Sequence, residues 1–363
     1  MITFESVTKR YPDGTVAADD LSFEVPEGEL VVLVGPSGCG KTTALRMVNR
    51  MIEPTEGRIS VNGRDAASVP APTLRRDIGY VIQQVGLFPH LTIADNVATV
   101  PSLIGWDKER TDERVEELID TVGLSQEVAG RYPRQLSGGQ QQRVGVARAL
   151  AADPPIMLMD EPFGAVDPIV RELLQDEFLR LQRELKKTII FVTHDIDEAM
   201  KMGDRIAIFN VGGVLEQYAT PTDLLAAPVN DFVVDFLGAE RNLKRLALIP
   251  VSAVEPESGP LVSADAPADR AKEAARESGT RWVLVSDAEQ RVQGWVSTDD
   301  LDGRETVEEA EVHPFGHFVT RDESLRAALD AMVESPLGVA VRVDEDGRYE
   351  GVVTHNTLTG ELE

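Results

Sequence analysis

The sequence is poor in cysteine and has no long apolar run. Cys39 is the only cysteine among 363 residues, so no disulfide can form within the chain, which agrees with a reducing compartment. No apolar run approaches the roughly 18 residues of a membrane-spanning helix, and the start MITFESVTKR does not have the pattern of a signal peptide. We therefore expect an intracellular chain whose membrane partner, if it has one, is another polypeptide.

Basic residues are scarce relative to acidic ones. The chain has 36 Lys and Arg against 62 Asp and Glu, a net charge of −26. Residues 251–363 hold 25 acidic and 10 basic side chains, a net of −15, whereas residues 1–250 hold 37 and 26, a net of −11. Such a surface repels nucleic acid and anionic lipid over a Debye length of about 8 Å, so we expect no nucleic-acid partner. The acid excess fits a salty cytoplasm and equally fits ordinary solubility.

The segment GPSGCGKTT is a candidate phosphate-binding loop. It follows a buried strand expected at Leu30–Val34 and precedes a helix expected to open at Thr42. Its glycines let successive N–H groups point inward, where the helix N-terminus adds partial positive charge. Lys41 can reach the β- and γ-phosphates of ATP, and the Thr42 hydroxyl can complete a Mg²⁺ shell. The candidate ATP-binding residues here are Gly35, Pro36, Ser37, Gly38, Cys39, Gly40, Lys41, Thr42 and Thr43.

Two carboxylates and a histidine are candidates for the hydrolytic chemistry. The apolar strand expected at Ile156–Met159 ends in Asp160 and Glu161. Because neighbouring residues on a strand point to opposite faces, we expect Asp160 to hold Mg²⁺ and Glu161 to polarise the attacking water. His194 follows another expected strand and would contact the γ-phosphate and hold that water in line. The alternatives are two solvated acids at a strand end and a structural histidine.

The motif LSGGQ, residues 136–140, predicts a second anion site. Ser137 is placed to cap a helix running to about Ala151, and two glycines leave the backbone bare at the first turn. Together with the preceding motifs, this segment resembles the ABC transporter ATPase family over about residues 1–240.

The resemblance implies a homodimer in which Ser137, Gly138, Gly139 and Gln140 of one subunit close over ATP held by the other. It also implies that Tyr11 stacks on adenine and that Gln83 senses Mg²⁺ and water. In the loop Phe163–Asp167, Ala165 and Asp167 would contact the second subunit. From the residues alone, Tyr11 could equally be a surface aromatic in a turn and Gln83 a plain polar strand residue.

The expected organisation is an α/β chain of several parts. Residues 1–240 would form a P-loop NTPase core with an antiparallel β subdomain and a helical insert at about 87–151. Core strands resume at Ile156, Ile189 and 205–209, separated by an amphipathic helix at 169–185. Prolines and a glycine in 250–260 predict that 241–260 is a linker.

The remaining residues contain an internal repeat. Shifting the sequence by 57 residues aligns Val262 with Val319 and Leu301 with Leu358 without a gap. Each copy is predicted as helix, strand, turn, strand and helix. The endings GWVSTDDL and GVVTHNTL resemble the tandem CBS module, an α+β fold, with copies at about 261–305 and 314–363.

In that family a hydroxyl and an acid of the closing motif contact the phosphate and ribose of a nucleotide. Ser297 and Asp300 fit this pattern, whereas the second copy has Thr354 with Thr357 at the acid position, so that cleft is expected to be degenerate. A purely structural or dimer-forming role is the alternative.

The segments 79–97 and 159–171, together with the CBS pair, most resemble the ATPases of quaternary-amine importers. The cargo would be glycine betaine, carnitine, choline or proline betaine, with integral membrane permease subunits and an external substrate-binding protein as partners. The subunit would lie at the cytoplasmic face of the membrane. The alternatives are an importer of amino acids, sugars or polyamines, a soluble ABC ATPase acting on nucleic acid or ribosomes, and a nucleotide-sensing module.

Overall fold

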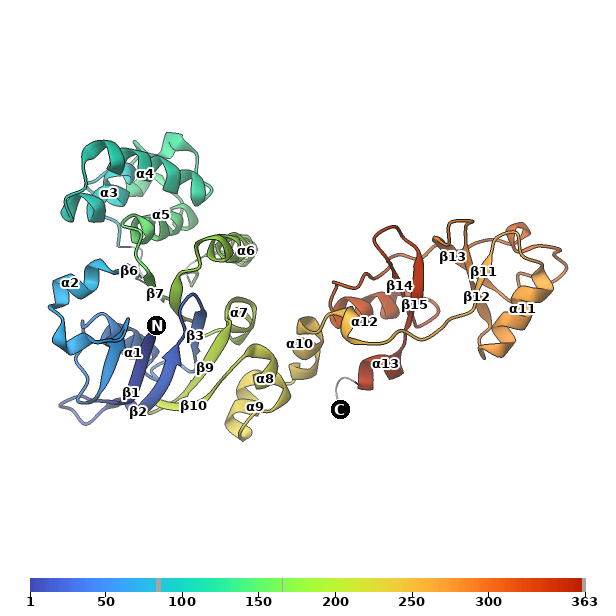
Figure 1. The fold of residues 1–363 in the computed structure, drawn as a ribbon, viewed down its shortest axis with the longest axis horizontal. Coiled ribbons are helices and arrows are strands. Elements are labelled where there is room, and N and C mark those ends of the chain that lie inside the picture. The colour runs from blue at the N-terminus through green and yellow to red at the C-terminus, as the bar shows by residue number, and fades with distance from the viewer. Residues whose placement is uncertain (83–85, 165, 361–363) are drawn as a thin grey trace. The chain divides into compact units, whose positions relative to one another are not determined.

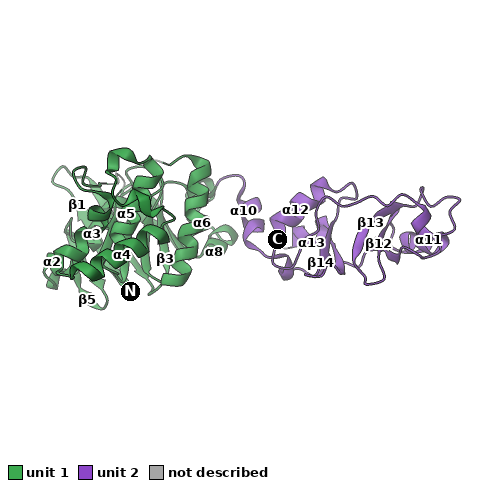
Figure 2. Cartoon of the chain, turned by 90° about the horizontal axis from the view of Figure 1, so that it is seen from above, with its two compact units in different colours: residues 1–237 green, residues 238–363 purple. Residues whose placement is uncertain are grey.

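The computed structural model describes residues 1–82, 86–164 and 166–360. It divides into two compact units, Met1–Leu237 and Gly238–Glu363, which are described separately (Figures 1 and 2). Among the described residues, no helix combines the length and the apolar character that crossing a membrane requires.

The first unit contains two sheets. The six-stranded sheet has the order β10-β9-β3-β8-β7-β6, in which only the edge strand β10 is antiparallel to its neighbour. Its strands are β3 (Leu30–Val34), β6 (Ile78–Val81), β7 (Ile156–Asp160), β8 (Thr188–Val192), β9 (Arg205–Asn210) and β10 (Val214–Ala219). The four-stranded antiparallel sheet has the order β2-β1-β4-β5, formed by β1 (Ile2–Arg10), β2 (Val16–Val25), β4 (Glu56–Val61) and β5 (Arg64–Asp65). The expected core strands and the antiparallel subdomain are therefore confirmed.

Helices pack on the six-stranded sheet, and three of them form the predicted helical insert. The insert holds α3 (Ile93–Leu103), α4 (Lys108–Thr121) and α5 (Gly138–Leu150). The other helices are α1 (Lys41–Val48), α2 (Ala71–Arg76), α6 (Pro168–Leu185), α7 (Ile196–Met202), α8 (Pro221–Ala226) and α9 (Asp231–Leu237). The helix after the phosphate loop begins at Lys41, one residue before the expected start.

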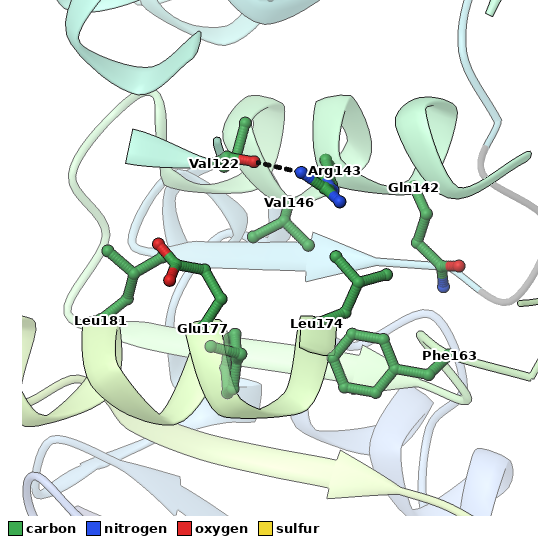
Figure 3. A pocket seen from close by; sticks show the side chains of 9 residues that line it. Val122, Gln142, Arg143, Val146, Phe163, Leu174, Glu177 and Leu181 are labelled. Carbon is green, nitrogen blue, oxygen red and sulfur yellow. Dashed lines mark hydrogen bonds between the residues drawn. The ribbon is translucent and has the colours of Figure 1, made fainter. Parts of the chain in front are cut away.

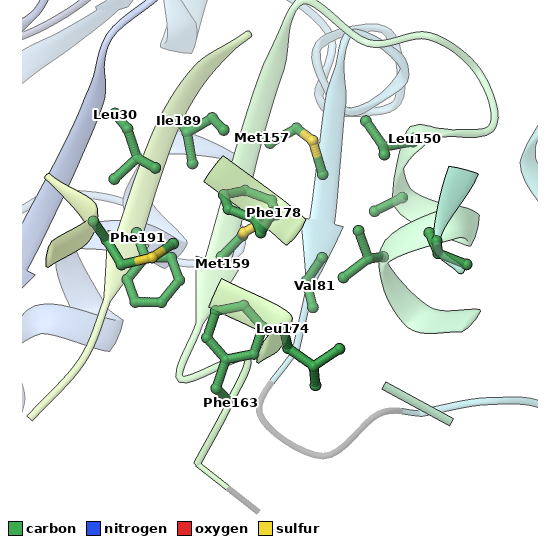
Figure 4. Close-up of a cluster of buried hydrophobic side chains, with 14 of the residues drawn as sticks. Leu30, Val81, Leu150, Met157, Met159, Phe163, Leu174, Phe178, Ile189 and Phe191 are labelled. Atoms are coloured by element: carbon green, nitrogen blue, oxygen red, sulfur yellow. The ribbon is translucent and has the colours of Figure 1, made fainter. Parts of the chain in front are cut away.

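The alternation along β7 separates two buried clusters. Met157 and Met159 belong to the cluster that also holds Phe163 and Phe178, next to α6 (Figure 4). Ile156 and Leu158 belong to the other cluster, together with apolar residues of α1 and the antiparallel sheet. Because side chains alternate along a strand, Asp160 points to the α1 side of the sheet.

A small apolar cavity lies between α5 and α6. Val146 of α5 and Leu174 of α6 face it, and the Arg143 guanidinium donates a hydrogen bond to the carbonyl of Val122 at its rim (Figure 3). Most of its lining residues are apolar, although Gln142, Arg143 and Glu177 also line it.

The second unit contains the predicted repeat. The first copy has β11 (Leu261–Ser263), α11 (Ala268–Glu277), β12 (Trp282–Ser286) and β13 (Val292–Ser297). The second has α12 (Leu325–Glu334), β14 (Ala340–Val343), β15 (Tyr349–Val353) and α13 (His355–Gly360). The parallel pairs Val262↔Val285 and Val319↔Arg342 are related by the 57-residue shift. The closing helix expected in the first copy is a turn instead, since the sequence TDDLDGR is rich in turn-forming Asp and Gly.

Symmetric hydrogen bonds join the two copies. Val292 N–H donates to the Gly347 carbonyl at 3.3 Å, and Tyr349 N–H donates to the Gln290 carbonyl at 3.1 Å. Each residue of one bond is 57 positions from its counterpart in the other, and Arg291 pairs with its own counterpart Arg348. The copies are therefore related by an approximate two-fold axis at this point.

Each copy is completed by a segment outside its own repeat. Val307 and His313 of the connection between the copies bond to Ala266 and Trp295 of the first copy. Val251 and Glu257, which precede the first copy, make the equivalent bonds to Glu323 and Val352 of the second.

Residues 241–260 are therefore different from the expected linker. They contain α10 (Arg241–Leu248), and Leu246, Val251 and Val254 are buried in one cluster with Leu325 and Leu358. The prolines of this segment end the helix but do not prevent packing, because apolar side chains recur between them. The copy boundaries 261–305 and 314–363 leave out the segments that complete each copy.

We predict that a fragment 238–363 unfolds cooperatively in urea and that a fragment 261–363 does not. The shorter fragment lacks Leu246, Val251 and Val254, whose burial contributes about 5 kcal/mol in total, comparable with the whole stability of a small unit. A fragment 249–363, which keeps the two valines but not α10, is the control and should be intermediate. Equal urea midpoints for the 238–363 and 261–363 fragments would contradict the segment exchange.

Candidate nucleotide-binding and hydrolytic site

The phosphate loop connects β3 to α1, as predicted, and its glycines stand where a side chain would not fit. Gly35 has φ +152°, and a Cβ there would lie 2.2 Å from the Phe209 carbonyl oxygen. Gly40 has φ +102°, and its Cβ would lie 1.9 Å from the Ala17 carbonyl oxygen. Only glycine permits this close approach of backbones, so the loop presents bare N–H groups at the start of α1.

Lys41 is held inside the loop. Its side chain is buried, and Nζ donates hydrogen bonds to the carbonyl oxygens of Gly35 at 2.7 Å and Pro36 at 3.0 Å. Nζ also lies 3.5 Å from the Sγ of Cys39, whose side chain is fully buried. The lysine ammonium is therefore already positioned where a phosphate would bind, while Cys39 is inaccessible to redox partners.

Asp160 and Thr42 meet at the predicted metal position. The Thr42 hydroxyl donates a hydrogen bond of 2.8 Å to a carboxylate oxygen of Asp160, which is only 2% exposed. Burial raises the pKa of Asp160, whereas the Thr42 hydrogen bond and the charge of Arg46 lower it. Oxygen ligands of this kind suit Mg²⁺, which keeps phosphate oxygens and water as its remaining ligands.

Glu161 lies at the same edge but is not oriented by strand alternation. It follows the last residue of β7 and adopts φ 46°, the left-handed conformation that a side chain of this type rarely occupies. Its N–H donates to the Val192 carbonyl at 3.0 Å, which ties it to the end of β8. At this φ Glu161 departs from strand geometry, so alternation along β7 does not by itself set the direction of its side chain. Strain of this kind is typical of functional sites.

His194 comes next to Glu161. Its Nδ1 lies 3.3 Å from the Glu161 carboxylate, and its side chain is 59% exposed. The residues expected to act on the attacking water are thus adjacent in space although 33 positions separate them in sequence. Parallel strands β7 and β8 bring them together.

A cavity of about 370 Å³ lies over the phosphate loop and Glu161, and neither Asp160 nor His194 is among its lining residues. It is lined by Tyr11, Thr15, Ala17, Ser37, Gly38, Gly40, Lys41, Thr42, Thr43 and Glu161. Tyr11 stands at its edge in a turn, with the Lys9 ammonium 5.3 Å from the ring centroid. An aromatic edge, a loop of bare N–H groups and a lysine fit the base and the phosphates of ATP.

The LSGGQ motif forms the expected helix start elsewhere in the unit. Ser137 caps α5 by accepting the N–H of Gln140, whose side chain in turn accepts the Ser137 N–H at 3.0 Å. Gly138 and Gly139 occupy the first turn between them. None of the residues lining the cavity comes from this motif, so the chain has two separate helix N-termini of the kind that can bind an anion.

Two of the predicted residues, Gln83 and Ala165, lie outside the described residues. Asp167, the other predicted dimer contact, caps α6 by accepting the Ile169 N–H at 3.0 Å.

A carboxylate and a histidine lie together at the nucleotide position predicted for the first copy of the C-terminal unit. Ser297 accepts the Asp299 N–H, and a carboxylate oxygen of Asp300 lies 3.6 Å from the Nε2 of His313. His313 packs against Trp295, with ring centroids 4.7 Å apart and the ring planes tilted by 37°. The histidine comes from the connecting segment 305–313 and was not found by sequence analysis.

The nucleotide position predicted for the second copy gains an acid that its sequence motif lacks. The Thr354 hydroxyl donates to the Glu257 carboxylate at 2.6 Å, and the Thr357 hydroxyl donates to the same oxygen at 3.3 Å. Glu257 occupies the place that His313 has in the first copy. A weak extension of the repeat could have revealed both Glu257 and His313. Residues 250–257 align with 306–313, but at a shift of 56 rather than 57 residues. Because one extra residue changes the shift, the 57-residue alignment does not pair Glu257 with His313.

Comparisons with known proteins agree with this geometry. Residues 18–164 match the family described as ABC transporter, and residues 313–363 match the family described as CBS domain. The osmoprotectant import ATP-binding protein OsmV of Salmonella typhimurium is 46% identical over 369 residues, covering 100% of this chain and 96% of that protein. The glycine betaine/carnitine/choline transport ATP-binding protein OpuCA of Bacillus subtilis is 42% identical, covering 99% of this chain and 95% of that protein.

One solved structure with a similar fold is a dimeric post-hydrolysis state of the ATP-binding cassette MJ0796 bound to ADP and Pi. The TM-score is 0.56 at 36% identity, covering 61% of this chain and 99% of that chain. With the family matches, this confirms the expected fold, a P-loop NTPase core followed by a CBS region.

We predict that Gly40→Ala weakens ATP binding by at least about tenfold, because the added Cβ forces the loop away from the Ala17 carbonyl. Titration with a fluorescent ATP analogue measures the effect. Gly212→Ala is the control, because Gly212 has φ +90° but open space around it. This substitution therefore adds backbone strain of about 1 kcal/mol without a steric clash. Unchanged ATP affinity in Gly40→Ala would contradict the assigned loop geometry.

Proposed function

The chain belongs to the ABC transporter family of ATP-binding proteins, and we propose that its ATP hydrolysis powers the import of quaternary amines such as glycine betaine, carnitine and choline. The observation that carries the cargo assignment is the similarity to importer subunits along the whole chain, C-terminal unit included. The contacts among Thr42, Asp160, Glu161 and His194 support the hydrolytic part.

Each residue of the site has a distinct part in the hydrolysis we propose. Lys41 and the loop N–H groups bind the phosphates, and Tyr11 stacks on the adenine. Glu161 accepts a proton from the attacking water, while His194 holds that water in line with the γ-phosphate. Thr42 and Asp160, with Gln83, would hold Mg²⁺, which neutralises phosphate charge when bound.

The protein works as a homodimer in this proposal. The LSGGQ motif lies outside the cavity of its own chain, so Ser137, Gly138, Gly139 and Gln140 are free to contact the γ-phosphate held by a second copy. The dimeric state of the similar cassette supports this arrangement. Ala165 and Asp167 lie in the loop that would meet the second copy.

The partners follow from the transport role. Integral membrane permease subunits would carry the cargo, and an external substrate-binding protein would deliver it. The subunit would sit at the cytoplasmic face of the membrane through the permease. Import of amino acids, sugars or polyamines, or a soluble role, is less well supported because the reported relatives match nearly the entire chain.

Uptake of labelled glycine betaine, with choline and carnitine as competitors, tests the function. Cells lacking the gene should regain uptake with the wild type and not with Glu161→Gln, because losing a general base costs about 10²- to 10⁴-fold in rate. Glu161→Gln should still bind ATP and accumulate as a closed dimer on size exclusion. Rapid ATP turnover by this variant would contradict the role of Glu161, and unchanged uptake in all strains would remove the cargo assignment.

We also propose that the C-terminal unit binds an adenine nucleotide through Ser297 and Asp300 in the first cleft and Thr354 in the second, and thereby tunes transport. Calorimetry on the fragment 238–363 should give heat with at least one of ATP, AMP or a cyclic dinucleotide. Asp300→Asn should abolish it at the first cleft, whereas the control Asp299→Asn at an exposed neighbour should not. Absence of heat with all three ligands would contradict the proposal.

A further inference from the structure

Two helices lead directly away from the hydrolytic residues. The helix α6 begins shortly after Glu161, and α7 begins two residues after His194. They pack beside one another on one face of the six-stranded sheet (Figure 1). Any contact between them therefore links the backbone that follows Glu161 to the backbone that carries His194.

A buried polar contact joins these helices. The Gln175 side-chain amide on α6 donates a hydrogen bond of 2.9 Å to the Glu198 carboxylate on α7, and the two residues are only 6% and 9% exposed. They lie among apolar side chains, including Leu174 and Ala199. Burial raises the pKa of Glu198, whereas hydrogen bonds from Thr193 and Gln175 lower it. A carboxyl group in such a place costs stability unless it is paired, so its contacts define its position sharply.

Glu198 contacts the residues on both sides of His194. The Thr193 hydroxyl accepts the Asp195 N–H at 3.1 Å and lies near enough to the Glu198 carboxyl group to lower its pKa. Asp195 in turn caps α7 by accepting the Glu198 N–H at 3.2 Å. Because the His194 side chain is itself 59% exposed, these neighbours, rather than packing around the ring, determine where it lies.

The same face of α6 reaches the loop that follows Glu161. Arg171, one turn before Gln175, donates a hydrogen bond of 3.0 Å to the Val166 carbonyl, and its charge lowers the pKa of Glu198. Arg171 and Gln175 lie one turn apart on α6, so the contact with this loop and the contact with Glu198 share one face of the helix.

We propose that Glu198 is a positioning residue for ATP hydrolysis: through Thr193 and Asp195 it fixes His194 beside Glu161, and through Gln175 it couples that position to α6. The inference rests on the proposed roles of Glu161 and His194. Glu198 touches neither nucleotide nor water, and it acts only through the histidine.

The test is steady-state ATP hydrolysis by the full-length chain carrying Glu198→Gln. The substitution keeps the shape of the side chain but replaces one acceptor with a donor facing Thr193. We expect kcat to fall about tenfold, with the KM for ATP and the Kd for the fluorescent ATP analogue within about twofold of wild type, because only the transition-state position of His194 is disturbed. Glu184→Gln, the same change at an exposed position on α6, is the control and should be neutral.

A second background separates positioning from a structural role. The residual ATP turnover of His194→Ala is measured by release of labelled phosphate. Adding Glu198→Gln to this variant should lower that turnover by less than about twofold, because the histidine through which Glu198 acts is absent. An equal loss in both backgrounds would overturn the inference and leave the proposed function intact. Full activity of His194→Ala alone would instead overturn the role of His194 in the proposed function.

Thr193→Val provides an independent variant if Glu198→Gln does not fold. It removes the hydroxyl that lies near Glu198 and accepts the Asp195 N–H, while preserving a buried side chain of the same shape. We expect the same fall in kcat at unchanged ATP affinity. Wild-type turnover by Thr193→Val would contradict the proposed path to His194.

Discussion

The parallel register of β3, β8 and β7 is the constraint on which the site depends. Leu33 pairs with Val192, and Val192 pairs with Asp160, so the three strands end at the same level. The phosphate loop leaves the first strand, His194 follows the second, and Asp160 ends the third with Glu161 directly after it. Because parallel strands share their carboxyl edge, groups more than 100 residues apart in sequence meet there.

At the carboxyl edge of these strands, the contacts of each side chain depend on which face of the sheet it lies on. Asp160 continues the alternation of Ile156 and Leu158 and meets Thr42 on the α1 side. Glu161 leaves this pattern through its left-handed backbone, and the buried contact of Gln175 with Glu198 supports its histidine neighbour from the far side of the sheet. The hydrolytic geometry therefore combines a regular strand, one strained residue and one buried polar pair.

The C-terminal unit uses a different device, the exchange of segments between two similar copies. Residues 249–257 and 305–313 complete the copies and also bring a side chain into each cleft. The resulting chemistry differs, since one cleft pairs His313 with Asp300 and the other pairs Glu257 with two threonines. Glu257 belongs to the segment that follows α10, so the acid near Thr354 and Thr357 is supplied by residues that precede the first copy.

Local patterns determined most of what was predicted correctly. The apolar run Leu30–Val34, the glycine loop, the Ser137 cap and the pattern within each repeat copy depend on residues close in sequence. All have the expected structure except the closing helix of the first copy, which is a turn. Tertiary structure alone decided the direction of Glu161, the helix within 241–260 and the carboxylate of Glu257 in the second cleft. These depend on a backbone strained by its surroundings and on contacts between segments about 100 residues apart, whose free energy exists only after the chain has folded.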